Sequence, residues 1–465
     1  MKNTVFFLLL LILMPGIAVS QDDKFSGIWM GKLAVGGVEL RIVFNIEIND
    51  SGAYSATMDS PDQGAAGIPV GPVEVKDDSL IIHAPTLRGE YRGLLESAEK
   101  ITGKWTQMGR SMVLDLSKQE KKLTLNRPQE PLEPFPYLAK DVRFENKAGG
   151  FELAATLTLP EEGEGFAAVV LISGSGQQNR DEEIFGHKPF KVIADYLTNK
   201  GIAVLRYDDR GAGGSGGNPA GATSYDFMKD AEAAVEYLLT VEGIDRNKIG
   251  IIGHSEGGLI APLLASLRDD IAFIILLAGP GTSGKQLLLD QNDYISRKSG
   301  VPDATIRQNI EMMDSIYNIM MQVEKQEEGA RKIKNYTTGV LKELGNSDDI
   351  INTVLENMDT QLGPASYNWF RYFIMADPAE YLPRVKCPVL ALNGEKDCQV
   401  IYKQNLEGIQ KGLGNNSDVT VVSFPDLNHL FQHSQTGLVN EYATIEETFS
   451  TEVLEIMASW INERF

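Results

Sequence analysis

The chain has 465 residues, a length that suits two domains. Of these residues 43% are hydrophobic and 23% are charged, a composition that excludes a largely disordered protein. Lysine and arginine number 43 against 64 aspartate and glutamate residues, so the formal net charge is −21. Because so acidic a surface repels phosphate backbones, we expect no nucleic-acid partner.

The first twenty residues have the pattern of a secretory signal peptide. Lys2 is positive, Val5–Met14 is an apolar run, and residues 18–20 (Ala-Val-Ser) are the small residues that precede a cleavage site. About ten apolar residues are too few to cross a bilayer of about 30 Å as a helix. We therefore expect residues 1–20 to be removed and the protein to be exported, to the periplasm or outside the cell, with no membrane span after cleavage.

Residues 22–125 are predicted to form a small antiparallel β-sandwich or barrel. Residues 38–48 alternate apolar and polar side chains, as in a half-buried strand, and residues 49–52 supply a turn before further short strands. We find no chemical motif there, so a carbohydrate- or partner-binding module and a structural accessory both stay open. Residues 126–139 contain four prolines and are predicted to be a stiff linker.

The remaining chain, residues 140–465, alternates short apolar runs with helical patterns. This alternation predicts a mostly parallel sheet with helices on both faces, after an antiparallel lead-in hairpin. The expected strands are 142–145, 151–159, 167–172, 202–207, 248–252, 273–277, 388–392 and 419–424. Between about residues 281 and 378, a stretch rich in helix formers predicts an inserted helical cap.

The sequence Gly253-His254-Ser255-Glu256-Gly257 lies between an expected strand and an expected helix. The turn between them is so sharp that side chains at the flanking positions would clash, which explains the two glycines. It also holds the Ser255 hydroxyl near the positive end of a helix, where a developing oxyanion is stabilised. The pentapeptide alone is common by chance, but this context indicates that Ser255 is a nucleophile.

A serine hydroxyl needs a general base, and the chain has five histidines. His429 follows the last expected strand and can lie over the sheet edge, so it is the candidate base. His254 adjoins the serine but is expected to point away from the line of attack. Asp397, in the loop after strand 388–392, is the candidate acid that orients the base, with Glu395 as a spare.

Cleavage of an ester or amide also requires N–H donors for the oxyanion. We expect the backbone N–H of Glu256, directly after the nucleophile, to be one donor. The other is assigned to Ser175, with Gly176 as the near alternative, in the small-residue loop after strand 167–172. The candidate substrate contacts are Gly176 and Gln177 in this loop and Trp369 and Phe370 in the cap. The aromatic residues of the cap could equally belong to its hydrophobic core.

Several short motifs lie at the ends of the expected strands. They are Ser173–Gly176, Asp208–Gly211, Gly253–Gly258, Cys387–Leu390 and Gly394–Asp397. Together they resemble bacterial α/β-hydrolase carboxylesterases over about residues 140–465. The resemblance implies the α/β-hydrolase fold, catalytic residues in the order serine, aspartate, histidine, and hydrolysis of short acyl or acetyl esters. Members differ most in the β domain and the cap, so the resemblance does not identify the substrate.

These residues predict a serine esterase that works through an acyl-enzyme. His429 takes the Ser255 proton as the hydroxyl attacks the ester carbon, Asp397 stabilises the imidazolium, and water then releases the acid. The expected partner is a small-molecule or glycan-linked ester, without a cofactor. The sequence does not indicate the oligomeric state.

Three other functions compete with ester hydrolysis. A small peptidase or aminopeptidase could use the same triad, with an acidic anchor for an amine in the cap. The segment Gly211–Gly216 matches the Gly-x-Gly-x-x-Gly motif of dinucleotide-binding oxidoreductases, but Pro219 and a loop to Thr223 separate it from the next helix. A non-catalytic binding protein on a hydrolase scaffold is disfavoured, because nothing structural demands a complete triad.

We expect neither a metal site nor a disulfide. His429 and His433 are four residues apart, but no glutamate fills the second position of a His-Glu-x-x-His motif. A strand and a loop separate Cys387 from Cys398, which places them about 20 Å apart at about 3.3 Å per residue. A disulfide tolerates at most about 7 Å, so two free thiols are expected.

Overall fold

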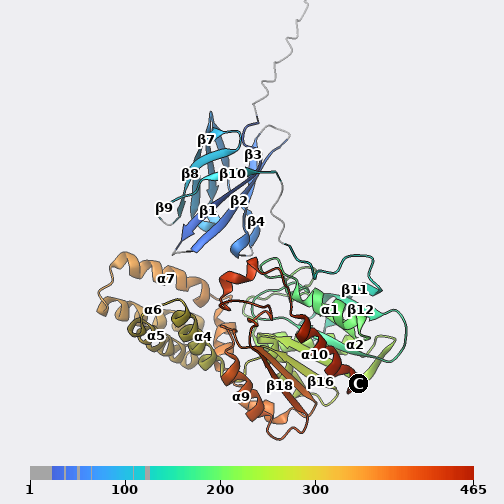
Figure 1. Ribbon diagram of the computed structural model, residues 1–465. Coiled ribbons are helices and arrows are strands. Elements are labelled where there is room, and N and C mark those ends of the chain that lie inside the picture. Colours follow the sequence, from blue (N-terminus) through green and yellow to red (C-terminus); the bar gives the residue numbers. More distant parts are fainter. Residues whose placement is uncertain (1–22, 36–37, 50–52, 64, 108, 121–125) are drawn as a thin grey trace, which may run out of the picture. The chain divides into compact units, whose positions relative to one another are not determined.

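The computed structural model describes residues 23–465 except 36–37, 50–52, 64, 108 and 121–125. The predicted signal peptide, residues 1–20, lies outside the described residues. The chain divides into two compact units, residues 1–124 and residues 125–465, here called the N-terminal and C-terminal units (Figure 1).

The N-terminal unit is one antiparallel sheet of ten strands in the order β4-β3-β2-β1-β10-β8-β7-β6-β5, with β9 paired to β8. Its strands are β1 (Gly27–Val35), β2 (Val38–Ile48), β3 (Tyr54–Ser60), β4 (Ala65–Pro69), β5 (Val73–Lys76), β6 (Ser79–Ala84), β7 (Gly89–Ser97), β8 (Lys100–Gln107), β9 (Arg110–Val113) and β10 (Leu116–Gln119). Trp29, Phe44, Tyr91 and Trp105 are buried in one core. Because strands from across the sheet share this core, the sheet curls around it as a half-barrel. The antiparallel β domain is confirmed, but as one continuous sheet instead of the two sheets of a sandwich.

The C-terminal unit is built on a sheet of eight strands in the order β11-β12-β14-β13-β15-β16-β17-β18. Its strands are β11 (Tyr137–Asn146), β12 (Phe151–Pro160), β13 (Phe166–Ile172), β14 (Ala203–Tyr207), β15 (Ile244–His254), β16 (Phe273–Leu277), β17 (Val389–Gly394) and β18 (Val419–Phe424). The hairpin β11–β12 is antiparallel, and β12 joins β14 antiparallel. From β14 to β18 every pairing is parallel, which confirms the predicted mostly parallel sheet.

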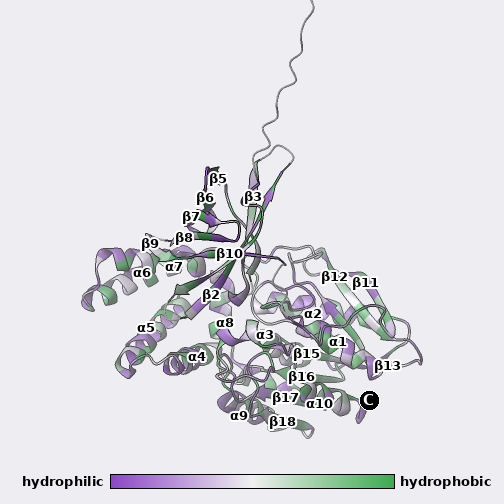
Figure 2. Cartoon of the chain, turned by 45° about the horizontal axis from the view of Figure 1, so that its top comes forward, coloured by the Kyte–Doolittle hydropathy of each residue, from purple (hydrophilic) through white to green (hydrophobic). Residues whose placement is uncertain are grey.

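Helices cover both faces of this sheet. They are α1 (Pro189–Asn199), α2 (Ser224–Leu238), α3 (Glu256–Ala265), α9 (Tyr402–Gly412) and α10 (Thr451–Asn462). Side chains of α1 and α10 share one buried cluster with the sheet, and those of α2, α3 and α9 share another with its opposite face. Strands enclosed in this way must be apolar on both sides. Figure 2 accordingly shows green along the central strands and mixed colours on the outer helices.

Five helices between β16 and β17 form the inserted cap that the sequence predicts between residues 281 and 378. They are α4 (Gly284–Lys298), α5 (Asp303–Gln322), α6 (Gln326–Glu343), α7 (Asp348–Leu362) and α8 (Tyr367–Met375). The cap has its own apolar cluster, which includes Tyr317, Met320, Ile333 and Tyr367. Within the described ranges, no helix combines the length and the hydrophobicity needed to cross a membrane.

The proline-rich segment before β11 is not the linker predicted over residues 126–139. The Arg127 guanidinium donates hydrogen bonds to four backbone carbonyls that lie far away in the sequence, those of Phe185, Gly186, Ala443 and Ile445. The Gln129 side-chain oxygen accepts hydrogen bonds from the N–H groups of Thr448 and Phe449. These contacts fasten the segment to the C-terminal unit, and β11 already begins at Tyr137. The prediction failed because proline content reports stiffness and not attachment.

Candidate active site

Ser255 occupies a strained turn between β15 and α3. Its φ of +52° and ψ of −115° lie where a non-glycine residue is rarely found. A Cβ atom on Gly253 would lie 2.0 Å from the Gly257 carbonyl oxygen, and one on Gly257 would lie 2.2 Å from the Ile172 carbonyl oxygen. Close approach of the backbone therefore requires glycine at both positions, where the sequence predicts a sharp turn.

Asp397 and His429 form the pair that the sequence predicts. The Asp397 Oδ2 atom lies 2.8 Å from Nδ1 of His429, and the aspartate side chain is fully buried. Its other oxygen accepts hydrogen bonds from the N–H groups of Gln399 and Val400, at 2.7 and 2.9 Å. With Nδ1 bound to the carboxylate, Nε2 is the ring atom left to act as a base.

The spare candidate, Glu395, is placed elsewhere, because its carboxylate accepts a hydrogen bond from the Ser423 hydroxyl at 2.8 Å. Ser255 and His429 line one cavity of about 240 Å³, here called the serine cavity. The tertiary structure thus brings the candidate nucleophile and the candidate base, from the ends of β15 and β18, to one cavity.

The predicted oxyanion donors border the same cavity. Ser175 and Glu256 both line it, and Glu256 is the first residue of α3, where a helix leaves its N–H groups without intrahelical acceptors. A Cβ atom on Gly174 would lie 3.2 Å from Cβ of Ser255, so this loop rests against the nucleophile. The Gly174 N–H donates to Glu182 at 2.6 Å, which leaves the next N–H, that of Ser175, as the candidate donor.

The sequence did not identify Glu182, a buried carboxylate beside the serine cavity. Its Oε1 atom lies 2.9 Å from Nδ1 of His254, whose Nε2 lies 3.0 Å from the carbonyl oxygen of His429. Burial alone lowers the pKa of His254, but the Glu182 carboxylate and the His429 carbonyl more than offset this, so the pKa is raised. Both ring nitrogens of His254 are thus occupied, and the ring links two loops of the site.

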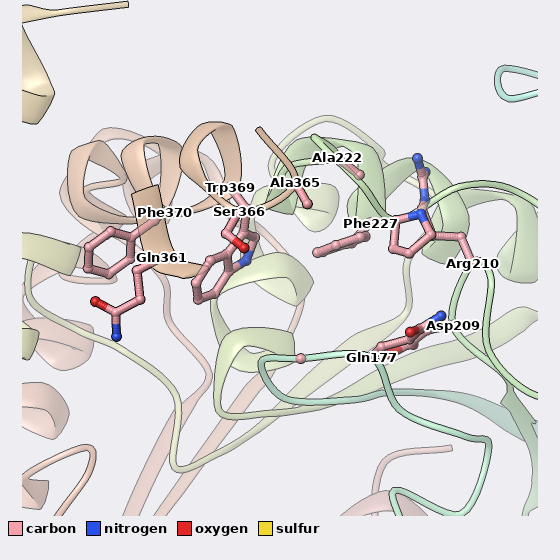
Figure 3. A pocket seen from close by; sticks show the side chains of 12 residues that line it. Gln177, Asp209, Arg210, Ala222, Phe227, Gln361, Ala365, Ser366, Trp369 and Phe370 are labelled. Carbon is pink, nitrogen blue, oxygen red and sulfur yellow. The ribbon is translucent and has the colours of Figure 1, made fainter. Parts of the chain in front are cut away.

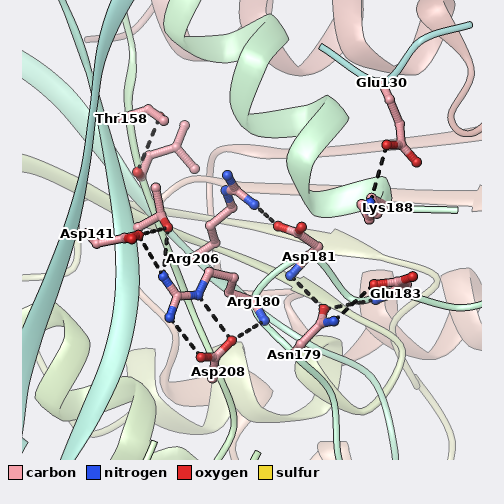
Figure 4. A network of polar contacts seen from close by, with 12 residues as sticks. Glu130, Asp141, Thr158, Asn179, Arg180, Asp181, Glu183, Lys188, Arg206 and Asp208 are labelled. Carbon is pink, nitrogen blue, oxygen red and sulfur yellow. Dashed lines mark hydrogen bonds and ion pairs between the residues drawn. The ribbon is translucent and has the colours of Figure 1, made fainter. Parts of the chain in front are cut away.

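Acidic residues after β14 hold the oxyanion loop in place. Arg180 reaches Asp208 at 2.8 Å, and the Asp209 carboxylate accepts hydrogen bonds from the Ser173 hydroxyl and the Gln178 N–H, both at 2.8 Å. Figure 4 shows Arg180 between Asp208 and Asp141, with Arg206 paired to Asp181 next to it.

Asp209 takes part in this network, but the residue that follows it does not. Arg210 turns away and pairs with the buried carboxylate of Asp230, with 2.7 Å between Nε and Oδ2. Burial raises the pKa of Asp209 to about 7, and the nearby carboxylates of Glu182 and Asp230 add to the shift.

The Glu256 side chain connects the nucleophile turn to the cap. Its Oε1 atom accepts hydrogen bonds from the Ser224 hydroxyl at 2.6 Å and from the indole N–H of Trp369, on α8, at 2.9 Å. Burial raises the pKa of Glu256. Trp369 and Phe370, the predicted cap contacts, line the serine cavity, whereas Gly176 and Gln177 line a neighbouring one.

The glycine-rich segment, the second histidine of the 429/433 pair and the two cysteines are the remaining features that the sequence singles out. In the glycine-rich segment after β14, the Gly214 N–H donates to Asp208 and the Gly216 N–H donates to the Glu152 carbonyl, so this loop packs on its own sheet. His433 pairs with Glu447 at 2.8 Å. Cys387 and Cys398 are free thiols, as predicted.

Two family models match within the C-terminal unit. Residues 187–341 match the model described as serine aminopeptidase, S33, and residues 369–463 match the dienelactone hydrolase family. Both matches fall on the parallel sheet that carries the strained serine and the Asp397–His429 pair. The C-terminal unit has the α/β-hydrolase fold. In this fold the elbow serine follows the strand β15, and the candidate acid and base follow β17 and β18.

The chain is similar to several known proteins. It is 27% identical over 299 residues to esterase EstD of Thermotoga maritima, covering 64% of this chain and 61% of that protein. It is 21% identical over 239 residues to the acylamino-acid-releasing enzyme of Rattus norvegicus, covering 50% and 25%. The chain thus spans less than two thirds of the length of these relatives. The Pyrococcus furiosus esterase Pf2001 superposes with a TM-score of 0.44 at 15% identity, covering 74% of this chain and 99% of that structure.

Proposed function

We propose that the protein hydrolyses carboxylic esters through an acyl-enzyme on Ser255. The observation that carries the proposal is the convergence of three predicted groups. The elbow serine and His429 line one cavity, and His429 is held by a fully buried carboxylate 2.8 Å from its Nδ1. Nothing in the folding of the sheet requires these groups to meet, whereas acyl transfer requires all of them.

The proposed reaction has two halves. In the first, Nε2 of His429 takes the hydroxyl proton of Ser255 as its Oγ attacks the ester carbon, and the N–H groups of Ser175 and Glu256 stabilise the oxyanion. The C–O bond to the alcohol breaks, and His429 returns its proton to the leaving alcohol. In the second, water attacks the acyl-serine while His429 takes a water proton, and the acid and free Ser255 are released.

The lining of the serine cavity favours an ester over an amine-bearing peptide. Its walls include Leu287, Leu288 and Phe373, which suit an apolar acyl or alcohol group. Two buried carboxylates also border it, but Glu182 is bound to His254 and Glu256 accepts hydrogen bonds from Ser224 and Trp369. An aminopeptidase needs a carboxylate that can bind the substrate ammonium, and these two are already occupied. The similarity to esterase EstD supports the same choice.

A substrate panel tests the proposal. We expect hydrolysis of p-nitrophenyl acetate and butyrate, no hydrolysis of aminoacyl-nitroanilides, and loss of at least about 10³-fold in kcat for Ser255→Ala. Ser97→Ala, on β7 of the N-terminal unit, is the matched control. A fluorophosphonate should label Ser255 by mass spectrometry. Acetylated glycans belong in the panel, because a glycan-linked ester is the finer candidate substrate. Full activity of Ser255→Ala would refute the proposal.

We further propose that the protein is exported, to the periplasm or beyond, after residues 1–20 are removed. The support is the charged start, the apolar run and the small residues before position 21. N-terminal sequencing of the protein recovered from periplasmic and culture fractions should begin near Gln21. A mature chain that still begins at Met1 and stays inside the cell would contradict this proposal.

A further inference from the structure

A second cavity of about 500 Å³, here called the side cavity, adjoins the serine cavity. The two cavities share one wall and lie along the same loop. Trp369 and Phe370 on α8 line both cavities. The loop after β13 borders both as well: its residues Gly174 and Ser175 line the serine cavity, and its next two residues, Gly176 and Gln177, line the side cavity. The side cavity therefore borders the same loop and the same helix as the space around Ser255.

The walls of the side cavity are mostly apolar and carry aromatic rings. Figure 3 shows Phe227 of α2 and Trp369 of α8 bordering the space from different elements, with Gln177 and Asp209 nearby. Trp369 is fixed, because its indole N–H donates to the buried Glu256. Preorganised aromatic walls favour a flat apolar group that can stack on or meet their edges.

The two ionisable groups that border the side cavity, Asp209 and Arg210, already have partners. The Arg210 guanidinium binds the buried Asp230 at 2.7 Å and lies over the Phe227 ring, 5.6 Å from its centroid. The Asp209 carboxylate accepts hydrogen bonds from Ser173 and Gln178. An anionic or cationic ligand would have to displace one of these pairs, whereas a neutral ring would not.

We infer that the side cavity binds an aryl group of the ester substrate, carried on the acyl side or the alcohol side. The inference rests on the proposed function and names a substrate class for it. An ester such as methyl 3-phenylpropanoate places a ring a few bonds from the acyl carbon, and 3-phenylpropyl acetate places it on the alcohol side.

Filling the side cavity tests this inference. Ala222 on its wall is 7% exposed, and Ala222→Trp would occupy the space. Ala365→Trp is the second blocking variant, because Ala365 lines the cavity but is itself exposed, so its replacement leaves the core intact. Ala220→Trp is the matched control, since Ala220 is exposed in the loop before α2 and lies outside the cavity wall.

The measured quantity is the ratio of kcat/KM for each aryl ester to that for methyl propanoate or propyl acetate. We expect both blocking variants to lower this ratio about tenfold or more for one aryl ester, and the ester affected identifies the side that carries the ring. The control should keep the wild-type ratio. Equal losses on aryl and truncated esters, or unchanged ratios in both blocking variants, would overturn the inference while leaving ester hydrolysis in place.

A binding measurement separates this inference from the proposed function. In Ser255→Ala protein, 3-phenylpropanamide should bind at least about tenfold more tightly than propanamide by calorimetry, and Ala365→Trp added to that variant should remove the difference. This result would support the side cavity even if no ester were hydrolysed. Equal binding of the two amides would overturn the inference.

Discussion

His254 and Glu182 form a buried pair, with 2.9 Å between Nδ1 and Oε1. The other ring nitrogen, Nε2, lies 3.0 Å from the carbonyl oxygen of His429. Both partners of the ring are acceptors, so only a doubly protonated imidazolium can donate to both. Because Glu182 also accepts the Gly174 N–H, one charged pair joins the oxyanion loop, the elbow and the loop of the base. We regard Glu182 and His254 as positioning residues.

Glu182→Gln should lower kcat for p-nitrophenyl acetate about 10- to 100-fold with a smaller change in KM. The amide cannot compensate a buried imidazolium, so the loop that carries Ser175 shifts, and a small misplacement of a reacting group costs up to about 100-fold. The exposed neighbour gives the control, Glu183→Gln, which should keep wild-type kinetics. A fully active Glu182→Gln enzyme would show that the pair has no positioning role.

Asp397→Asn should lower kcat about 10³- to 10⁴-fold without unfolding the protein. An asparagine can still accept the N–H groups of Gln399 and Val400, but it stabilises neither the correct tautomer nor the imidazolium of His429. Thermal melting should confirm that the fold is kept. Glu395→Gln is the comparison, and an equal loss in that variant would mean that the acid has been wrongly assigned.

Gly257→Ala should destabilise the protein, because the new Cβ would lie 2.2 Å from the Ile172 carbonyl oxygen. Backbone must move to relieve this contact, which costs about 1–3 kcal/mol or more in the free energy of unfolding. Gly339→Ala, in α6, gives a control of opposite sign. A Cβ there meets nothing within 4 Å, so the helix should gain about 0.5–1 kcal/mol. Urea unfolding of both variants measures the difference, and equal effects would refute the steric argument.

Asp209 should make the stability of the protein fall as the pH rises from about 4 to 7. Its pKa is raised to about 7 by burial, so the folded state holds a proton that the unfolded state releases above about pH 4. The stabilisation is full below the unfolded pKa and is lost as the pH passes the folded value, at a slope of at most about 1.4 kcal/mol per pH unit.

Asp209→Asn removes this titration but keeps partners for Ser173 and Gln178. Denaturant unfolding at pH 4, 5, 6, 7 and 8 should therefore show wild type losing stability relative to the variant between pH 4 and 7, and no further above pH 8. Parallel pH profiles for the two proteins would mean that Asp209 ionises normally.

The sequence by itself determined the strand ends of the C-terminal unit and the residues placed on them. Apolar runs separated by helical patterns predict the parallel strands, because such strands are buried on both faces. The glycines around Ser255 report a local backbone constraint, and Asp397 and His429 follow their strands directly. Signals of this kind depend on neighbouring residues only, so they can be recognised without knowing what lies opposite.

The tertiary structure alone decided how these ends are held together. Glu182 meets His254 across 72 residues of chain and Trp369 meets Glu256 across 113, and no spacing rule predicts either contact. The same reason accounts for the mistaken linker, where Arg127 satisfies carbonyls more than 300 residues away. The partners of side chains at loop ends depend on which groups lie close in space. Those positions are set only when the sheet and the cap have packed. The side cavity between α2 and α8 arises in the same way.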